Sequence, residues 1–227
     1  FHLEKETLTE SKDIDRNPYL VNCLNGVYDL EQKKFKTHDQ CREQYLTKQL
    51  PVIYDTEAKC EKFQNFVKDI VGKEEDAKTI QKLFGYFLFK MYIYEKLFLF
   101  KGAGRNGKGK LLKVAEMMLG EENTTGYSIA QLEFNRFSAA YVYRKLGNLC
   151  GDISYSELTH TGTIKKLTGQ DPIAAEIKSG KQFKFYNYAK MVFLANEMPL
   201  IREDTDAMWE RIEVLELPHS FIPAQIC

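Results

Sequence analysis

The sequence has little of what builds a disulfide-stapled, zinc-binding or membrane-spanning protein. Its five cysteines, at positions 23, 41, 60, 150 and 227, form no CxxC pair and are odd in number. That spacing offers neither a zinc site nor a disulfide framework and suits a reducing cytosol. The longest apolar stretch, residues 83–94, is interrupted by Lys90 and is too short to cross a bilayer. With no signal peptide visible, we expect a cytoplasmic protein that does not enter a membrane.

The sequence also lacks an excess of charge of either sign. Its 32 Lys and Arg residues balance 32 Asp and Glu residues, so no global field attracts nucleic acid, and any such contact must come from a local patch. The 227 residues suffice for one sizeable core, or for a core with a small accessory domain. Because the chain starts with Phe1 rather than Met, we expect it to be part of a longer protein.

What the sequence does contain is a glycine-rich turn between an apolar run and a helical pattern. Residues 96–120 read KLFLFKGAGRNGKGKLLKVAEMMLG. Strand, glycine loop and helix form the context of a phosphate-binding P-loop, in which backbone N–H groups and the helix N-terminus face an anion. The predicted nucleotide-binding residues are Gly102, Ala103, Gly104, Arg105, Asn106, Gly107, Lys108, Gly109 and Lys110. Lys108 would reach the β- and γ-phosphates; the alternative is a plain glycine turn with Lys108 solvated.

One position of this loop departs from the usual pattern. The residue after the P-loop lysine is normally Ser or Thr, whose hydroxyl binds Mg²⁺. Here that residue is Gly109, so magnesium must rely on water or on another side chain, or bind weakly.

Two later strands are predicted to end in polar residues. A strand over residues 146–150 would place Asp152 just beyond its carboxyl end, and a fully apolar strand over residues 191–195 would end at Asn196. Ligands of open α/β sheets bind at this edge. An acid there can hold Mg²⁺ or a water, and an amide can sense the γ-phosphate. Glu157 is either a second carboxylate or a solvated acid at a helix start.

Lysines gather around a predicted β-hairpin. Two β-like runs flank Ser179-Gly180, with Lys178 and Lys181 at the turn, and no acid lies between Lys178 and Lys190. A lysine-tipped hairpin suits contact with a nucleic-acid backbone, which is non-specific and salt-sensitive. Solvated lysines on a turn are the alternative. Arg202 and Arg211, near the last predicted strand, are either surface ion-pair partners or arginines that act on a neighbour's nucleotide.

The N-terminal part is predicted to be a small α+β region. Asn25-Gly26 between two short apolar runs indicates a hairpin. A helix is expected from Lys59 to Gly72, followed by a second helix over residues 80–91 that is apolar on every side. The extra apolar face of the second helix either packs in the core or meets another subunit.

At this point the chain resembles the superfamily 3 helicases, specifically the primase-helicases of poxviruses, satellite phages and plasmids. The segment GAGRNGKGKLL is similar to their Walker A motif, and GDIS at residues 151–154 to their Walker B. Three further segments follow in the family's order and spacing: IKKLTGQDPIAAEIK, NYAKMVFLANEMP and DTDAMWERI. Glu210 stands where many relatives carry another arginine before Arg211.

The resemblance implies an α/β fold with an AAA+-like P-loop ATPase core around a mainly parallel sheet. It implies an N-terminal domain over residues 1–94, the ATPase core over 95–218 and a tail over 219–227. It also implies ATP and Mg²⁺ as cofactors, with Lys108 on the phosphates, Asp152 serving the metal and water, Asn196 as sensor, and Arg211 acting on the neighbour's ATP.

The function that this resemblance implies is an ATP-dependent DNA helicase or translocase module of a viral or plasmid replication protein. It would form a homo-hexameric ring that threads single-stranded DNA past Lys178 and Lys181, with a primase or polymerase domain on the same full-length chain. A ring scaffold or loader with little ATP turnover is the alternative that Gly109 favours. A small-molecule kinase is a third hypothesis, which leaves the lysine hairpin unexplained.

Overall fold

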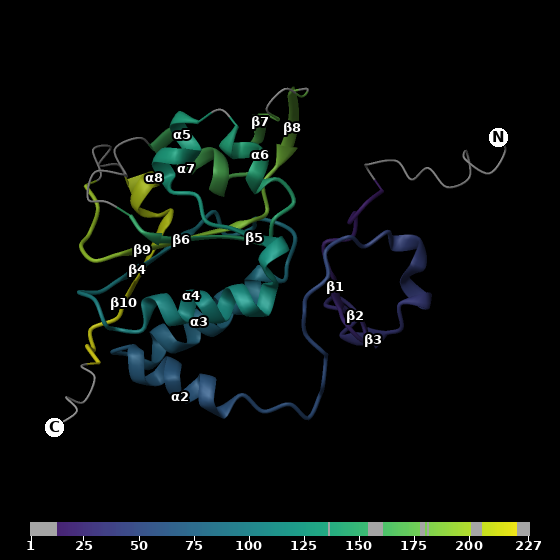
Figure 1. Cartoon of the computed structure of the whole chain (residues 1–227), viewed down its shortest axis with the longest axis horizontal. Helices are drawn as coiled ribbons and strands as arrows, with labels where there is room; N and C mark the ends of the chain where they lie inside the picture. Colours follow the sequence, from purple (N-terminus) through teal and green to yellow (C-terminus); the bar gives the residue numbers. More distant parts are fainter. Residues whose placement is uncertain are drawn as a thin grey trace. The chain divides into compact units, whose positions relative to one another are not determined.

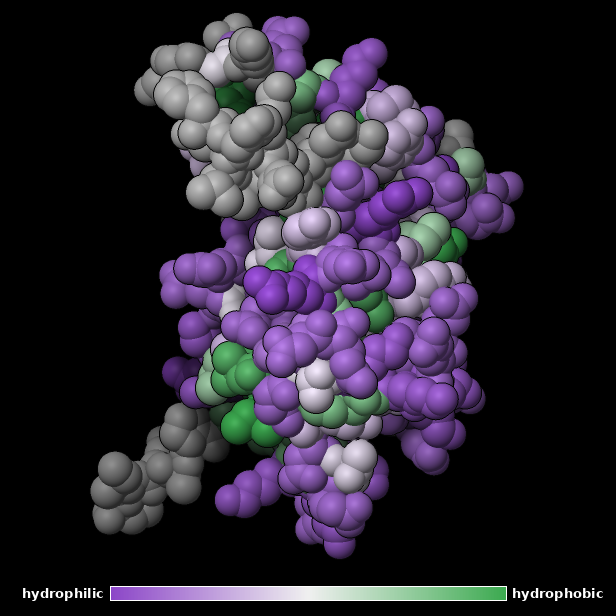
Figure 2. All heavy atoms as spheres, turned by 90° about the vertical axis from the view of Figure 1, so that its right-hand side faces the viewer, coloured by the Kyte–Doolittle hydropathy of each residue, from purple (hydrophilic) through white to green (hydrophobic). Residues whose placement is uncertain are grey.

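The structure is a computed structural model that describes residues 13–135, 137–153, 161–177, 180, 182–200 and 206–221. Contacts within the chain divide it into two compact units, residues 1–58 and residues 59–227. Neither unit's described helices include one long and apolar enough to span a bilayer. On the face drawn in Figure 2, hydrophilic side chains predominate and the apolar ones form small separate groups.

The first unit contains an antiparallel sheet of three short strands. β1 (Leu20–Cys23), β2 (Gly26–Asp29) and β3 (Lys34–Lys36) pair in that order, and a short 3-10 helix, η1 (Asp39–Gln44), follows. Its small core contains Leu20, Val27 and Cys41. The predicted hairpin is confirmed.

The turn of this hairpin lies one residue earlier than the Asn-Gly pair suggests. Gly26 pairs with Cys23, so the loop residues are Leu24 and Asn25. Gly26 is instead required for close approach, because a Cβ there would lie 2.6 Å from the carbonyl oxygen of Lys36 and from the ring of Phe35.

The second unit is built on a five-stranded sheet in which every neighbouring pair is parallel. Its strands are β4 (Leu97–Lys101), β5 (Thr124–Thr125), β6 (Gly147–Asp152), β9 (Lys190–Ala195) and β10 (Ile212–Glu216). Their order across the sheet is β10-β4-β9-β6-β5. All six residues of β9 are buried, which confirms the prediction of a central strand.

Helices cover both faces of this sheet (Figure 1). On one side lie α3 (Glu74–Phe87) and α4 (Lys108–Leu119), with α2 (Glu61–Ile70) beside α3 and the short η2 (Glu121–Asn123) after α4. On the other side lie α5 (Ile129–Phe134), α6 (Ser138–Val142), α7 (Thr161–Thr168) and α8 (Asp206–Trp209). The result is a three-layer α/β/α arrangement, as expected for a parallel sheet whose two faces are both apolar.

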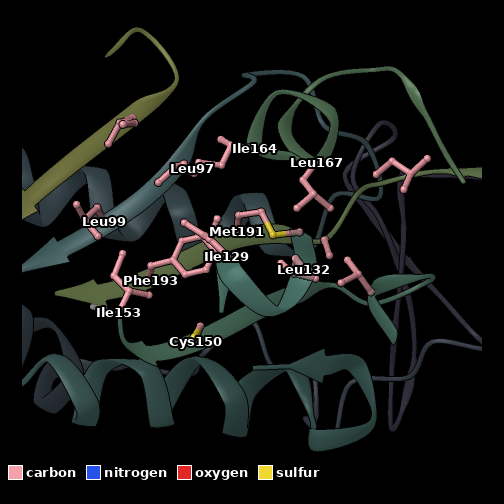
Figure 3. Packing of buried hydrophobic residues seen from close by; sticks show 14 of the residues in the cluster. Leu97, Leu99, Ile129, Leu132, Cys150, Ile153, Ile164, Leu167, Met191 and Phe193 are labelled. Atoms are coloured by element: carbon pink, nitrogen blue, oxygen red, sulfur yellow. The ribbon is translucent and has the colours of Figure 1, made fainter. Parts of the chain in front are cut away.

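The main core lies between the sheet and α5, α7 and α8. Figure 3 shows side chains of alternate strand residues meeting those of the helices. The sheet contributes Leu97, Leu99, Cys150, Met191 and Phe193, and the helices contribute Ile129, Leu132, Ile164 and Leu167. Because alternate residues of a strand point to opposite faces, Phe98, Phe100 and Val192 serve the other layer.

A two-stranded antiparallel hairpin stands apart from the five-stranded sheet. It consists of β7 (Pro172–Glu176) and β8 (Gln182–Tyr186). In Figure 1 it projects beside α6. The predicted hairpin around Ser179-Gly180 is thus confirmed in its strands.

The second predicted helix ends earlier than expected. α3 stops at Phe87 instead of continuing to Met91, because the N–H groups of Leu88 and Phe89 turn back onto the carbonyls of Gly85 and Tyr86. Met91 is 42% exposed and lies outside the helix. A contact of this segment with another subunit stays a prediction.

The predicted domain boundary at residues 94/95 also stays a prediction. In the structure α2 and α3 belong to the same compact unit as the parallel sheet, and the contact-based division falls between Ala58 and Lys59.

Candidate nucleotide-binding site

The glycine loop links the carboxyl end of β4 to the start of α4. The N–H of Gly102 donates to the carbonyl of Ala195 at 3.1 Å, which continues the pairing of β4 with β9 for one more step. A Cβ on Gly102 would lie 1.7 Å from Nδ2 of Asn106 and 2.6 Å from the carbonyl oxygen of Leu217. Only glycine therefore fits where the loop leaves the strand.

Asn106 fixes the loop from within. Its side chain is buried, and Nδ2 donates to the Leu217 carbonyl at 3.1 Å. Leu217 in turn donates its N–H to Lys101, and Phe221 donates to the carbonyl of Arg105 at 2.8 Å. The segment after β10 thus braces the loop, a contact that the sequence pattern did not indicate.

Lys108 is the first residue of α4 and is only 4% exposed. Its Nζ donates to Oδ1 of Asn196 at 3.0 Å and also to the carbonyl of Gly102. Asn196 follows β9 and is exposed. Two residues predicted separately, 88 positions apart, are therefore brought into direct contact.

An open hollow of about 530 Å³ lies over this loop. It is lined by residues 104–110 together with Lys113, Leu194 and Asn196. Four of these residues are cations, namely Arg105, Lys108, Lys110 and Lys113, and none is an acid. A concave surface of this charge, at the N-terminus of a 12-residue helix, favours an anion such as a polyphosphate.

Sequence reasoning missed Lys113 and Leu194 in this lining, and it included Gly102 and Ala103, which do not line the hollow. The spacing of Lys113, three residues after Lys110 on one helix, was an available signal. Its ammonium also pairs with Glu116, a half-buried carboxylate one turn further on.

Asp152 reaches the same edge of the sheet through its backbone. It is the last residue of β6, and it pairs with Leu194 after a bulge in the register. The predicted strand 146–150 is thus extended to include Asp152. The position of the Asp152 side chain is outside what the structure describes.

The fit of the loop to magnesium differs from its fit to phosphate. At Gly109 an added Cβ would meet nothing within 4 Å, so the position has room for a hydroxyl-bearing side chain but supplies none. Among the described residues no group of three or more His, Cys, Asp or Glu could hold a metal ion. The described donors suit a polyphosphate better than they suit a metal.

Arg211 is not brought to this hollow. It precedes β10, whose first residue pairs with Leu97 at the start of β4, so it lies at the opposite edge of the sheet. Its guanidinium pairs with Glu95 at 2.8 Å and donates to Oγ1 of Thr168 at 3.3 Å. Other predicted candidates, Lys178, Lys181, Glu157 and Arg202, lie outside the described residues.

Lys190, counted in the sequence with the lysines of the hairpin, is instead fully buried at the amino end of β9. Its Nζ donates to the carbonyls of Phe89, Met91 and Tyr188 and lies 4.3 Å from the ring centre of Tyr86. Burial lowers the pKa of Lys190 to about 7. This lysine is part of the core, and it is unavailable to a surface ligand.

Comparisons with known proteins agree with this arrangement. Residues 100–211 match a family of unknown function (DUF5906), and residues 3–72 match the family described as D5 N terminal like. The chain is 28% identical to "Putative helicase L207/L206" of Acanthamoeba polyphaga mimivirus, over 93% of this chain and 23% of that protein. It is 26% identical to "Putative helicase 121R" of Invertebrate iridescent virus 3, over 94% of this chain and 24% of that protein.

A third relative carries a different name. "Putative primase C962R" of African swine fever virus is 22% identical over 88% of this chain and 22% of its own length. The chain therefore spans about a quarter of the length of the curated relatives it matches.

Solved structures show a similar fold. The apo structure of the NrS-1 C-terminal region superposes with a TM-score of 0.60 at 18% identity, covering 77% of this chain and 42% of that one. A second structure of that region gives a TM-score of 0.57 at 13% identity and covers 92% of this chain and 62% of that one. These structures show that the fold is shared, and the viral putative helicases and putative primase named above confirm the resemblance of this chain to viral primase-helicases.

Proposed function

We propose that this chain is the ATP-dependent DNA helicase or translocase module of a viral replication protein. The observation that carries the proposal is the hollow whose described lining holds four cations and no acid, with Lys108 joined to Asn196 at its wall. A triphosphate bound there would be met by loop N–H groups, by the N-terminus of α4 and by the Lys108 ammonium.

The strand order supports an AAA+-type core. β9 lies between the P-loop strand β4 and β6, which carries Asp152. This order places Asn196 between the phosphate loop and the backbone of the acid, where an amide can orient the γ-phosphate or a water. Mg²⁺, when bound, would neutralise phosphate charge, and Asp152 is the residue we assign to hold it.

A ring accounts for the residues that the chain does not bring together. Arg211 lies at the opposite edge from Lys108, so we assign it to the nucleotide of a neighbouring copy and not to that of its own chain. In a homo-hexamer, six hairpins carrying Lys178 and Lys181 would focus charge in one channel, through which a net-neutral chain can hold single-stranded DNA. We place a primase or polymerase domain elsewhere on the full-length protein, which would work in the host cell cytoplasm.

The test is phosphate release with and without single-stranded DNA. Lys108→Ala should lower turnover at least about 100-fold, the scale of removing one charge-stabilising group from such a site. Lys78→Ala is the matched control, because Lys78 is an exposed helix lysine that is paired with Glu74 and does not line the hollow. Both variants should melt within a few degrees of wild type. Undiminished hydrolysis by folded Lys108→Ala would refute the proposal.

A nucleotide-binding ring scaffold or loader is the second candidate, favoured by the absent hydroxyl at Gly109. Sizing with an ATP analogue and single-stranded DNA reports assembly separately from turnover. Nucleotide-dependent rings that release no phosphate under any condition would select the scaffold and exclude the translocase.

A further inference from the structure

The β7–β8 hairpin has two unlike faces. One face carries Ile173, Ala175 and Phe185, all buried. The ring of Tyr143, after α6, meets Phe185 and Phe183 on this face at centroid distances of 5.2 and 5.0 Å. The inner face packs into the hydrophobic core, whereas the outer face does not contribute to it.

The outer face carries a single aromatic side chain. In the register of the hairpin Tyr186 lies opposite Pro172, and Lys184 lies opposite Ala174. Tyr186 is 67% exposed, and Lys184 is exposed beside it on the same face. The two small cross-strand partners leave the tyrosine ring and the lysine ammonium standing above the surface, about 7 Å apart along the strand.

The charge of this region favours an anionic ligand. The sequence contains no Asp or Glu from residue 177 to residue 190. The acid on the same face, Glu176, accepts a hydrogen bond from Nε2 of Gln182 at 3.5 Å and lies two cross-strand rows from Tyr186. Since Lys190 is buried, Lys184 is the described, exposed cation of the hairpin strands.

We propose that this outer face, with Tyr186 and Lys184, is a contact site for single-stranded nucleic acid. A base stacks on the Tyr186 ring and the adjoining phosphate pairs with Lys184. Exposed aromatic rings interleaved with cations are how proteins hold unpaired strands without reading sequence. The inference rests on the proposed function, and it extends the contact from the turn with Lys178 and Lys181 to the base of the hairpin.

The test is fluorescence anisotropy of a labelled oligothymidylate with the chain and an ATP analogue. Tyr186→Ala should weaken binding about 5- to 100-fold, as expected for one lost stacking contact, and Tyr186→Phe should bind as wild type does. Phe134→Ala is the matched control, because Phe134 is an aromatic residue of α5, outside the hairpin, and is 72% exposed. Lys184→Ala should weaken binding and should lower the slope of log affinity against log salt concentration by about one released ion. Tyr186→Ala should leave that slope unchanged.

A strand that lacks bases separates stacking from charge. An abasic oligomer should bind wild type and Tyr186→Ala equally, because only the phosphates remain. If the wild type binds no single strand at all, the proposed function fails. If it binds and Tyr186→Ala binds equally well, the inference fails and the proposed function stands. If Tyr186→Ala dissociates the assembly and leaves the affinity of assembled protein unchanged, the face is a contact between copies and the inference is overturned.

Discussion

Two lysines are buried at opposite edges of the same parallel sheet, and they have different surroundings. Lys108, at the carboxyl edge, is 4% exposed, and its ammonium lies at the wall of a hollow lined by three other cations. Lys190, at the amino edge, is fully buried, with three backbone carbonyls and the Tyr86 ring around its ammonium.

The difference shows that burial of a charge does not identify a functional site. The three carbonyls around Lys190 match the three N–H donors of an ammonium, so that group is satisfied inside the protein. Lys108 is held by Asn196 and the Gly102 carbonyl but faces an open hollow whose described lining is cationic, where an anion can reach it. What distinguishes the two is access together with the sign of the neighbouring charges.

Removing Lys190 is expected to have the largest effect on stability. Lys190→Ala leaves a cavity and takes the donor from the carbonyls of Phe89 and Met91, so the free energy of unfolding should fall by roughly 3–4 kcal/mol. Urea unfolding measures this. Lys108→Ala is the variant to compare with it. That variant should lower the free energy of unfolding much less than Lys190→Ala does, and it should stop ATP turnover. If Lys190→Met stayed stable and lost turnover instead, the contrast between the edges would be wrong.

The pH dependence of stability should separate the two lysines further. Below about pH 7 Lys190 is charged in both the folded and the unfolded chain, and the full cost of its burial is present. Above about pH 7 the folded form releases the proton while the unfolded chain keeps it, so stability should rise. Between pH 7 and 9 the gain should reach about 2 kcal/mol.

Urea titrations of wild type and Lys190→Met at pH 7, 8 and 9 test this sign. The free energy of unfolding of the wild type should rise with pH relative to that of Lys190→Met. A difference that is constant across this range would mean that Lys190 keeps its proton throughout.

The smallest expected effect is a change in the magnesium dependence of turnover when Gly109, at the carboxyl edge of the sheet, is replaced. Gly109→Ser adds a hydroxyl where a Cβ meets nothing within 4 Å, so it should tighten the magnesium requirement of turnover by about tenfold, or roughly 1.4 kcal/mol. Magnesium titration of the ATPase measures the shift. Gly109→Ala is the control, since it adds the methyl group and the helix propensity without the hydroxyl. Equal behaviour of the two variants would place the metal out of reach of residue 109.

Local patterns predicted the elements of the phosphate loop well. The apolar run before Gly102, the glycines and the spacing of Leu111 and Ala115 each depend on neighbours within a few residues, and β4 and α4 form where these patterns indicate. The strand ending in Asn196 was equally predictable, because a continuous apolar run has few other uses in an α/β protein.

The sequence-based predictions failed where contacts with a segment distant in the sequence determine the local structure. The sequence pattern of residues 80–91 is helical, yet α3 ends at Phe87 and the carbonyls of Phe89 and Met91 turn toward Lys190, about 100 positions away. The same contact removes Lys190 from the lysine patch of the hairpin. The bracing of Asn106 by Leu217 is likewise a contact between residues 111 positions apart.

By itself, then, the sequence determined the kinds of elements, the glycine loop and the resemblance to viral primase-helicases, because periodicity and motif spacing are properties of the chain read locally. The tertiary structure alone decided which lysine faces a ligand and which one the core encloses. Strand order sets that choice. It brings β9 beside β4, so that Asn196 meets Lys108 at one edge of the sheet, and at the other edge the segment of residues 86–91 packs against Lys190.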